Sequence, residues 1–166
     1  MEKQEAQGWD NLSGTEILPD DILPFIESCQ DKTCVLIRTR KDGHPIGAVV
    51  GYGVQDGEIY LVTDLYRAAH SALRRDPRCS AVFDDPARGS VTVIARAELI
   101  DDLDFIRQFF WDRSALSAEL RTGGKMTAEE FFNMSFTPNR RLIHILPEKY
   151  ITIDLTKLPT GPTQHA

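Results

Sequence analysis

Residues 33–85, TCVLIRTRKDGHPIGAVVGYGVQDGEIYLVTDLYRAAHSALRRDPRCSAVFDD, hold the pattern that decides the fold. Three apolar runs, at 34–37, 46–54 and 59–62, are separated by Lys41-Asp42-Gly43 and Gln55-Asp56-Gly57. An Asp-Gly step between apolar runs is a strong hairpin signal, because both residue types accept positive φ. The stretch therefore predicts an antiparallel meander at the centre of the protein.

Length and composition predict a single soluble domain. The chain has 166 residues, of which 42% are hydrophobic and 27% charged. We expect one domain over residues 16–156, between mobile tails at 1–15 and 157–166. The formal net charge of −6 argues against nucleic-acid binding, because a polyanion needs a basic field.

The same sequence indicates a cytoplasmic protein. No apolar stretch is long enough to span a membrane, and the polar N-terminus lacks the apolar segment of a signal peptide. Three cysteines, an odd number in apolar surroundings, suit buried thiols in a reducing compartment better than disulfides.

Helices are predicted on both sides of the meander. Asp20 and Asp21 supply N-cap and first-turn acids for a helix that runs to about residue 30, in which Pro24 is tolerable only in the first turn. A second helix, 67–75, ends at Asp76-Pro77. A helical insert is expected over 103–133, with a capping box at 127–130.

The remaining segments complete the sheet. Residues 79–83 and 91–100 are predicted strands, the second with apolar side chains on alternate positions. Residues 141–155 predict either one strand bent at Pro147 or a hairpin. A meander, an insert and returning strands favour a closed or nearly closed barrel, which removes exposed sheet edges.

No motif for nucleotide phosphates, serine hydrolysis or zinc proteolysis is present. The histidines fall on a turn, a helix, a strand and a tail, so no metal site is predicted: His44, His70, His144 and His165. The helix at 67–75 carries Arg67 and His70 one turn apart, directly after Thr63 and Asp64. This is either a solvated basic face or an anion site at a helix entrance.

The order of these segments resembles the pyridoxamine 5'-phosphate oxidase-like family of flavin-binding split barrels. The most specific part is Thr63 followed, after nine residues, by Leu-Arg-Arg-Asp-Pro-Arg at 73–78. The resemblance implies a mostly β, α+β fold, an antiparallel split β-barrel with flanking helices. It also implies a homodimer with flavin mononucleotide (FMN) in a cleft shared by both subunits.

The resemblance also implies where FMN would lie. In the family, the second strand runs along the flavin ring, and the threonine and the following helix hold the phosphate. This chain has Ala68 and Ala69 where members typically place basic residues, so Arg67 or His70 would take over. The cofactor-binding residues expected on this basis are Ile46, Gly47, Ala48, Val49, Val50, Val62, Thr63, Arg67 and His70.

The function expected from the resemblance is an FMN-dependent oxidoreductase, a reductase whose small-molecule substrate the sequence does not name. The strand at 46–50 lacks the arginine and lysine of the true pyridoxamine phosphate oxidases, which argues against vitamin B6 oxidation. No acid, base or nucleophile is assigned. The alternatives are a deazaflavin coenzyme, haem, or a flavin-binding module without catalysis.

Four aromatic residues in the insert admit two interpretations. Phe105, Phe109, Phe110 and Trp111 are too apolar to leave in water. They either form a dimer interface or cover the end of their own barrel, as amphipathic helices usually do.

Overall fold

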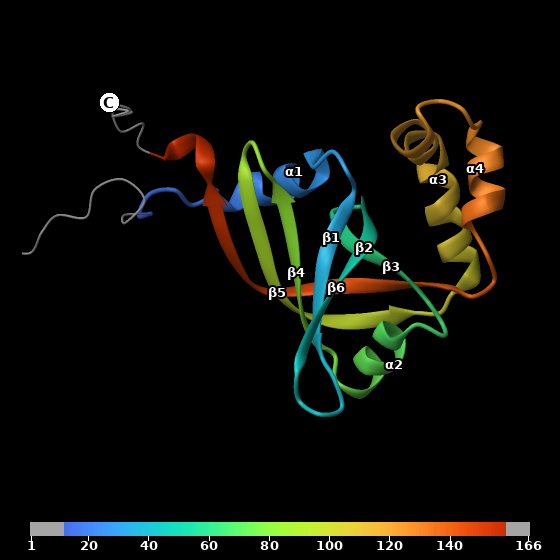
Figure 1. Cartoon of the computed structure of the whole chain (residues 1–166), viewed down its shortest axis with the longest axis horizontal. Helices are drawn as coiled ribbons and strands as arrows, with labels where there is room; N and C mark the ends of the chain where they lie inside the picture. The colour runs from blue at the N-terminus through green and yellow to red at the C-terminus, as the bar shows by residue number, and fades with distance from the viewer. Residues whose placement is uncertain (1–11, 159–166) are drawn as a thin grey trace, which may run out of the picture.

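The computed structural model describes residues 12–158 (Figure 1). The chain order of its elements is α1 (Pro19–Ser28), β1 (Thr33–Thr39), β2 (Pro45–Gln55), β3 (Glu58–Asp64), α2 (Ala68–Arg75), β4 (Arg78–Asp85), β5 (Gly89–Ile100), α3 (Leu103–Thr122), α4 (Ala128–Ser135), β6 (Arg140–Asp154) and the 3-10 turn η2 (Leu155–Lys157). All strand pairs are antiparallel. The strands close into a barrel in the order β1-β2-β3-β6-β5-β4, which confirms the predicted barrel.

Both predicted hairpins form. At the turn between β2 and β3, Asp56 and Gly57 have φ of 53° and 81°, the positive values that two-residue hairpin turns require. The predicted strand at 141–155 is one continuous strand, β6, and the hairpin alternative is wrong. Its bend coincides with a register shift against β5, where Ala95 pairs with Pro147 and Ile94 with Lys149. A bulge accommodates the missing proline N–H.

The core fills the barrel interior. Inward side chains of alternating strand residues are almost fully buried, among them Leu36, Leu61, Phe83, Val93 and Ile145. Helix α1 covers one end of the barrel, where Ile26 is fully buried and its carbonyl accepts a hydrogen bond from the Tyr52 hydroxyl. Three buried cysteines, Cys29, Cys34 and Cys79, are free thiols, as predicted.

The start of α1 differs from the prediction. Leu18 occupies the N-cap position without a side-chain cap, and Asp20 and Asp21 lie in the first turn. Pro24 lies in the helix interior, beyond the first turn to which we confined it. The helix tolerates it because Pro24 and Asp20 are exposed, so water can bond the Asp20 carbonyl that lacks an N–H partner.

The ordered domain extends further than predicted at both ends. Thr15, assigned to the mobile tail, is buried, and its carbonyl accepts a hydrogen bond from the Asp154 N–H. Lys157, assigned to the C-terminal tail, ends η2. Residues 1–11 and 159–166, with His165, lie outside the described residues.

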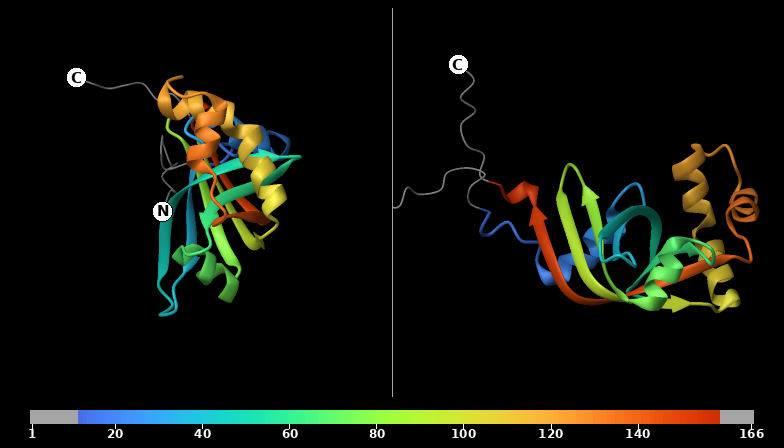
Figure 2. Two further views of the ribbon diagram at one scale, coloured as in Figure 1. Left: turned by 90° about the vertical axis from the view of Figure 1, so that its right-hand side faces the viewer. Right: turned by 60° about the horizontal axis from the view of Figure 1, so that its bottom comes forward.

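The insert forms a helical arm, made of α3 and α4, which stands beside the barrel (Figures 1 and 2). Asp102 caps α3, and the predicted capping box of Thr127 and Glu130 starts α4. The insert aromatics pack within their own chain: Phe105 and Phe109 lie 5.4 and 5.7 Å from the Tyr60 ring. Phe105 and Phe109 thus cover an outer barrel face rather than a barrel end, whereas Trp111 is 48% exposed and lies 5.3 Å from the Phe132 ring of α4.

Candidate functional site

Strand β2 is split between two environments. Residues 52–55 pair with β3, but residues 45–51 pair only with β1. Within residues 12–158, the side of 45–51 that faces away from β1 has no partner strand; we call it the open edge. Val62, Thr63 and Asp64 of β3 pair with β6 and not with β2. The barrel is therefore open between these two segments.

Five of the predicted cofactor residues form this open edge. Ile46, Ala48 and Val50 point to the inward side of the sheet. Their register partners on β1 are the buried residues Arg38, Leu36 and Cys34. Gly47 and Val49 face outward, and Val49 is 71% exposed. An apolar, solvent-exposed strand with free backbone groups is a surface that planar heterocycles can bind.

The two predicted residues on β3 face opposite ways. Thr63 points inward and is buried, whereas Val62 points outward and lies under the helical arm. A Cβ built on Gly51 would lie 4.0 Å from Val62, so β2 and β3 are still close where they begin to separate. The structure thus brings Val62 and Thr63 opposite the open edge.

The predicted pair on α2 is divided. The Arg67 side chain is 76% exposed, and its Nε lies 3.6 Å from Asp64. His70 is 2% exposed, and its Nε2 lies 3.8 Å from Asp101 without a hydrogen-bond partner. Burial, with Arg74 nearby, lowers the pKa of His70. The solvated-face interpretation therefore fits Arg67 but is wrong for His70.

Helix α2 and the β1–β2 hairpin lie at the same end of the barrel (Figure 1). Residues of both elements line a basic pocket. It has a volume of about 380 Å³. Four cationic side chains and one acidic side chain line it, together with small and apolar residues: Arg38, Thr39, Arg40, Lys41, Asp42, Ile46, Ala68, Ser71, Ala72 and Arg75. Ile46 therefore connects the open edge to a strongly cationic site.

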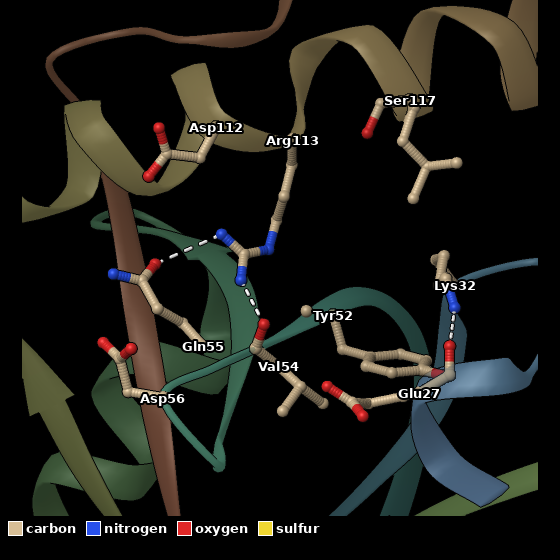
Figure 3. Close-up of a pocket in the computed structure, with 11 residues that line it drawn as sticks. Glu27, Lys32, Tyr52, Val54, Gln55, Asp56, Asp112, Arg113 and Ser117 are labelled. Atoms are coloured by element: carbon tan, nitrogen blue, oxygen red, sulfur yellow. Dashed lines mark hydrogen bonds between the residues drawn. The ribbon is translucent and has the colours of Figure 1, made fainter. Parts of the chain in front are cut away.

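A second cleft, the arm cleft, lies between α3 and β2. It consists of two adjoining cavities of about 460 and 350 Å³, which share Lys32, Tyr52, Arg113 and Ser117. Arg113 reaches from α3 to β2, where it donates hydrogen bonds to the Val54 carbonyl and to Gln55 Oε1 at 3.2 Å (Figure 3). Its guanidinium also lies 3.8 Å from the Phe109 ring centroid.

Gly53 makes this contact possible. A Cβ at residue 53 would lie 2.2 Å from Arg113 Nε and 2.9 Å from Phe109 Cζ. The arm thus rests directly on strand backbone, with the Arg113 guanidinium above it. The arm cleft combines aromatic walls with three arginines, Arg113, Arg121 and Arg140, which suits a planar or anionic ligand.

Sequence reasoning missed Arg38 and Arg113. Arg38 had a signal, because it occupies the inward position after Cys34 and Leu36 in the alternation of β1. Arg113 had none, because its role depends on how α3 lies over β2. Residues 12–158 contain no cluster that could hold a metal, and no helix there is both long and apolar enough to cross a membrane.

Comparison with known proteins identifies the family. The model of the family described as Pyridoxamine 5'-phosphate oxidase matches residues 18–153. No functionally curated protein matches the sequence. Among solved structures, the conserved hypothetical protein Rv2991 of Mycobacterium tuberculosis has 22% identity and a TM-score of 0.67, over 87% of this chain and 89% of its own.

Two further similar structures are of proteins whose names include a flavin or deazaflavin cofactor. A pyridoxamine 5'-phosphate oxidase-related, FMN-binding protein of Nostoc punctiforme has 17% identity and a TM-score of 0.60, over 86% of this chain and 87% of its own. An F420 reductase has 14% identity and a TM-score of 0.57, over 81% and 98%. At these identities the structures establish the split-barrel fold alone. Because the family model matches most of the chain, the protein belongs to the pyridoxamine 5'-phosphate oxidase family.

Proposed function

We propose that the protein is an FMN-dependent oxidoreductase that acts as a cytoplasmic homodimer on a small molecule. The observation that carries the proposal is the open edge of β2. On the side away from β1, its backbone N–H and C=O groups have no partner strand among residues 12–158, and a buried or covered edge must satisfy such groups. A flavin ring has both donors and acceptors along one side and would satisfy them.

The groups around the open edge suit the two ends of a phosphorylated flavin. Ile46 lines the basic pocket and Gly51 lines the arm cleft. The five residue steps between them span about 17 Å, from roughly 3.3 Å per residue. We place the ring along Ile46–Val50 and beside Val62 and Thr63, and the phosphate towards α2, where Arg67 and His70 lie.

The flavin would supply electron transfer, and the chain's own residues would supply binding and access. A Cβ at Gly47 would lie 3.1 Å from Val35 Cγ1, so the glycine lets the Val35 side chain lie close over β2 on its outer face. The arm cleft, with Phe109, Phe110 and Arg113, is the place where a substrate would approach the sheet. We assign no acid, base or nucleophile.

The dimer would use the outer face of β1 and β2. Val35 and Val49 are register partners there, and they are 36% and 71% exposed. Apolar side chains in adjacent positions on a sheet face are typical of an interface. Val49→Glu should therefore leave a monomer of 18.7 kDa by light scattering, whereas the unaltered chain should have twice this mass.

Ligand binding tests the proposal directly. The purified full-length chain is titrated separately with FMN, the F420 coenzyme and haem, and binding is followed by absorbance and fluorescence. We expect FMN to bind with a dissociation constant at least tenfold lower than the others. Tighter binding of F420 or haem than of FMN would overturn the assignment of FMN as the cofactor. FMN binding without electron transfer to any acceptor would favour a flavin-binding module without catalysis.

A further inference from the structure

The inward row of β1 ends in an arginine. Cys34, Leu36 and Arg38 occupy alternate inward positions, and Arg38 is 8% exposed. Arginine is almost never fully buried in proteins unless a partner neutralises it. A partner is therefore expected close to the Arg38 guanidinium.

The part of the chain that the structure describes supplies no partner for two of its nitrogens. Arg38 Nε and Nη1 are buried and have no hydrogen-bond partner. The ion pairs found among residues 12–158 do not include Arg38. Buried donors of a charged group are nearly always satisfied in native proteins, and the exceptions mark ligand sites or other special functions.

The surroundings of Arg38 add positive charge. Arg38 lines the basic pocket with Arg40, Lys41 and Arg75. The one carboxylate of the pocket, Asp42, is already 3.0 Å from Arg40. Arg75 Nη2 donates to the Thr39 carbonyl at 2.8 Å, which holds that guanidinium beside the pocket. The pocket lining therefore has four cationic side chains and one carboxylate, and that carboxylate is already paired with Arg40.

We propose that Arg38 is the buried anchor of an anion site that binds a phosphate monoester between α2 and the β1–β2 hairpin. The Nε and Nη groups of a guanidinium form a planar fork that matches two phosphate oxygens. Ala68, at the start of α2, lines the same pocket and provides no charge. Arg38, on a different element, supplies the charge that Ala68 does not.

The identity of the monoester rests on the proposed function: it is the phosphate of FMN. Ile46 pairs with Arg38 in the β1–β2 register and is also the first apolar residue of the open edge. A phosphate held by Arg38 would therefore lie at the end of the surface proposed for the flavin ring. Arg67 lies outside the pocket lining and would contribute from the exposed side.

Inorganic phosphate is the probe for the site. Its binding to the flavin-free, full-length chain is measured by calorimetry at constant ionic strength, for the unaltered chain, Arg38→Met and Arg74→Met. Arg74 is the control arginine: it lies on α2, the helix beside the pocket, but it is exposed and does not line the pocket. We expect Arg38→Met to weaken phosphate at least tenfold and Arg74→Met less than twofold.

Thermal stability separates binding from folding. Removing a buried, unpaired charge should leave the melting temperature of Arg38→Met equal to or above that of the unaltered chain in phosphate-free buffer. Added phosphate should raise the melting temperature of the unaltered chain but not of the variant. If Arg38→Met does not fold, Arg38→Lys, which keeps the charge but not the fork, should fold and bind phosphate at least fivefold more weakly.

Two outcomes overturn the anion site: no phosphate binding by the unaltered chain, or equal binding by the chain and its Arg38 variants. A flavin comparison tests the assignment independently. Arg38→Met should weaken FMN at least tenfold and riboflavin less than twofold, and phosphate should compete with FMN. Phosphate binding that depends on Arg38 but does not compete with FMN would keep the site and overturn its assignment to the flavin.

Discussion

Replacing Gly53 with alanine should detach the helical arm from the sheet. The new Cβ would lie 2.2 Å from Arg113 Nε, 2.8 Å from Arg113 Cδ and 2.9 Å from Phe109 Cζ. Real Cβ atoms do not approach other atoms this closely, so Arg113 must move away from β2. Gly53 has no positive φ, so the backbone itself accepts alanine.

The magnitude follows from the contacts that Arg113 would lose. It makes two hydrogen bonds between elements, to the Val54 carbonyl and to Gln55 Oε1. A hydrogen bond from a charged donor contributes about 1.5–3 kcal/mol, and partial exposure of Arg113 reduces this. We expect a loss of about 2–4 kcal/mol, which raises the opening equilibrium of the arm on the order of 100-fold.

Hydrogen exchange measures this opening locally. Amides of α3 that face β2 should exchange faster in Gly53→Ala, while those of β4 and β5 should keep their protection. Gly51→Ala is the matched control: Gly51 lies on the same strand and lines the same cleft, and a Cβ there meets nothing nearer than 3.9 Å. Equal exchange in the two variants would refute the proposed contact between Arg113 and β2.

Three other perturbations have defined outcomes. Burial raises the pKa of Cys34 to about 12 and of Cys79 to about 11. Neither thiol should therefore react with a disulfide reagent at pH 8 until urea unfolds the chain. Stability should fall as the pH rises from about 9 towards 12, because the unfolded thiols lose their protons there before the folded ones do. Burial lowers the pKa of His70 from its usual value of 6.5, despite the opposing effect of Asp101, so in acid the unfolded chain binds a proton that the folded chain resists. Stability should therefore fall as the pH is lowered through this range. His70→Gln should flatten the pH dependence of the urea midpoint, and an unchanged pH dependence would contradict this. Arg67→Ala should weaken FMN severalfold more than riboflavin, and the difference should shrink at high salt, because Arg67 is exposed; equal weakening of both ligands would assign Arg67 to folding.

Local patterns predicted the strands, and long-range packing decided the rest. Asp56-Gly57 and the alternation of β5 specify a hairpin and a half-buried strand through nearby residues alone. The pairing of β3 with β6 joins segments about 80 residues apart, and no local signal encodes it. The prediction that confined Pro24 to the first turn was wrong, because only the packed helix shows that Pro24 and Asp20 lie on its exposed side.

In the candidate site, too, some features could be predicted from the local sequence and others depend on long-range packing. The apolar run Ile46–Val50 was visible in the sequence, but its open edge appears only when β3 is known to leave β2 after Leu61. Arg38 could have been found by extending the alternation of β1 by one position. The close contact between Gly53 and Arg113 could not have been predicted from the sequence, because it arises where helix α3 crosses strand β2, 60 residues away along the chain.

The open edge also bears on how the chain behaves when it is overproduced. Residues 45–51 read PIGAVVG, an uncharged and largely apolar segment whose exposed backbone groups can pair with the same segment of another molecule. Pro45 and the two glycines oppose such pairing, because proline removes one donor and glycine disfavours extended packing. These residues weaken the pairing but leave the edge unpaired, so aggregation of the chain should begin at this strand. Any ligand that occupies the edge should then act as a solubilising agent as well as a cofactor.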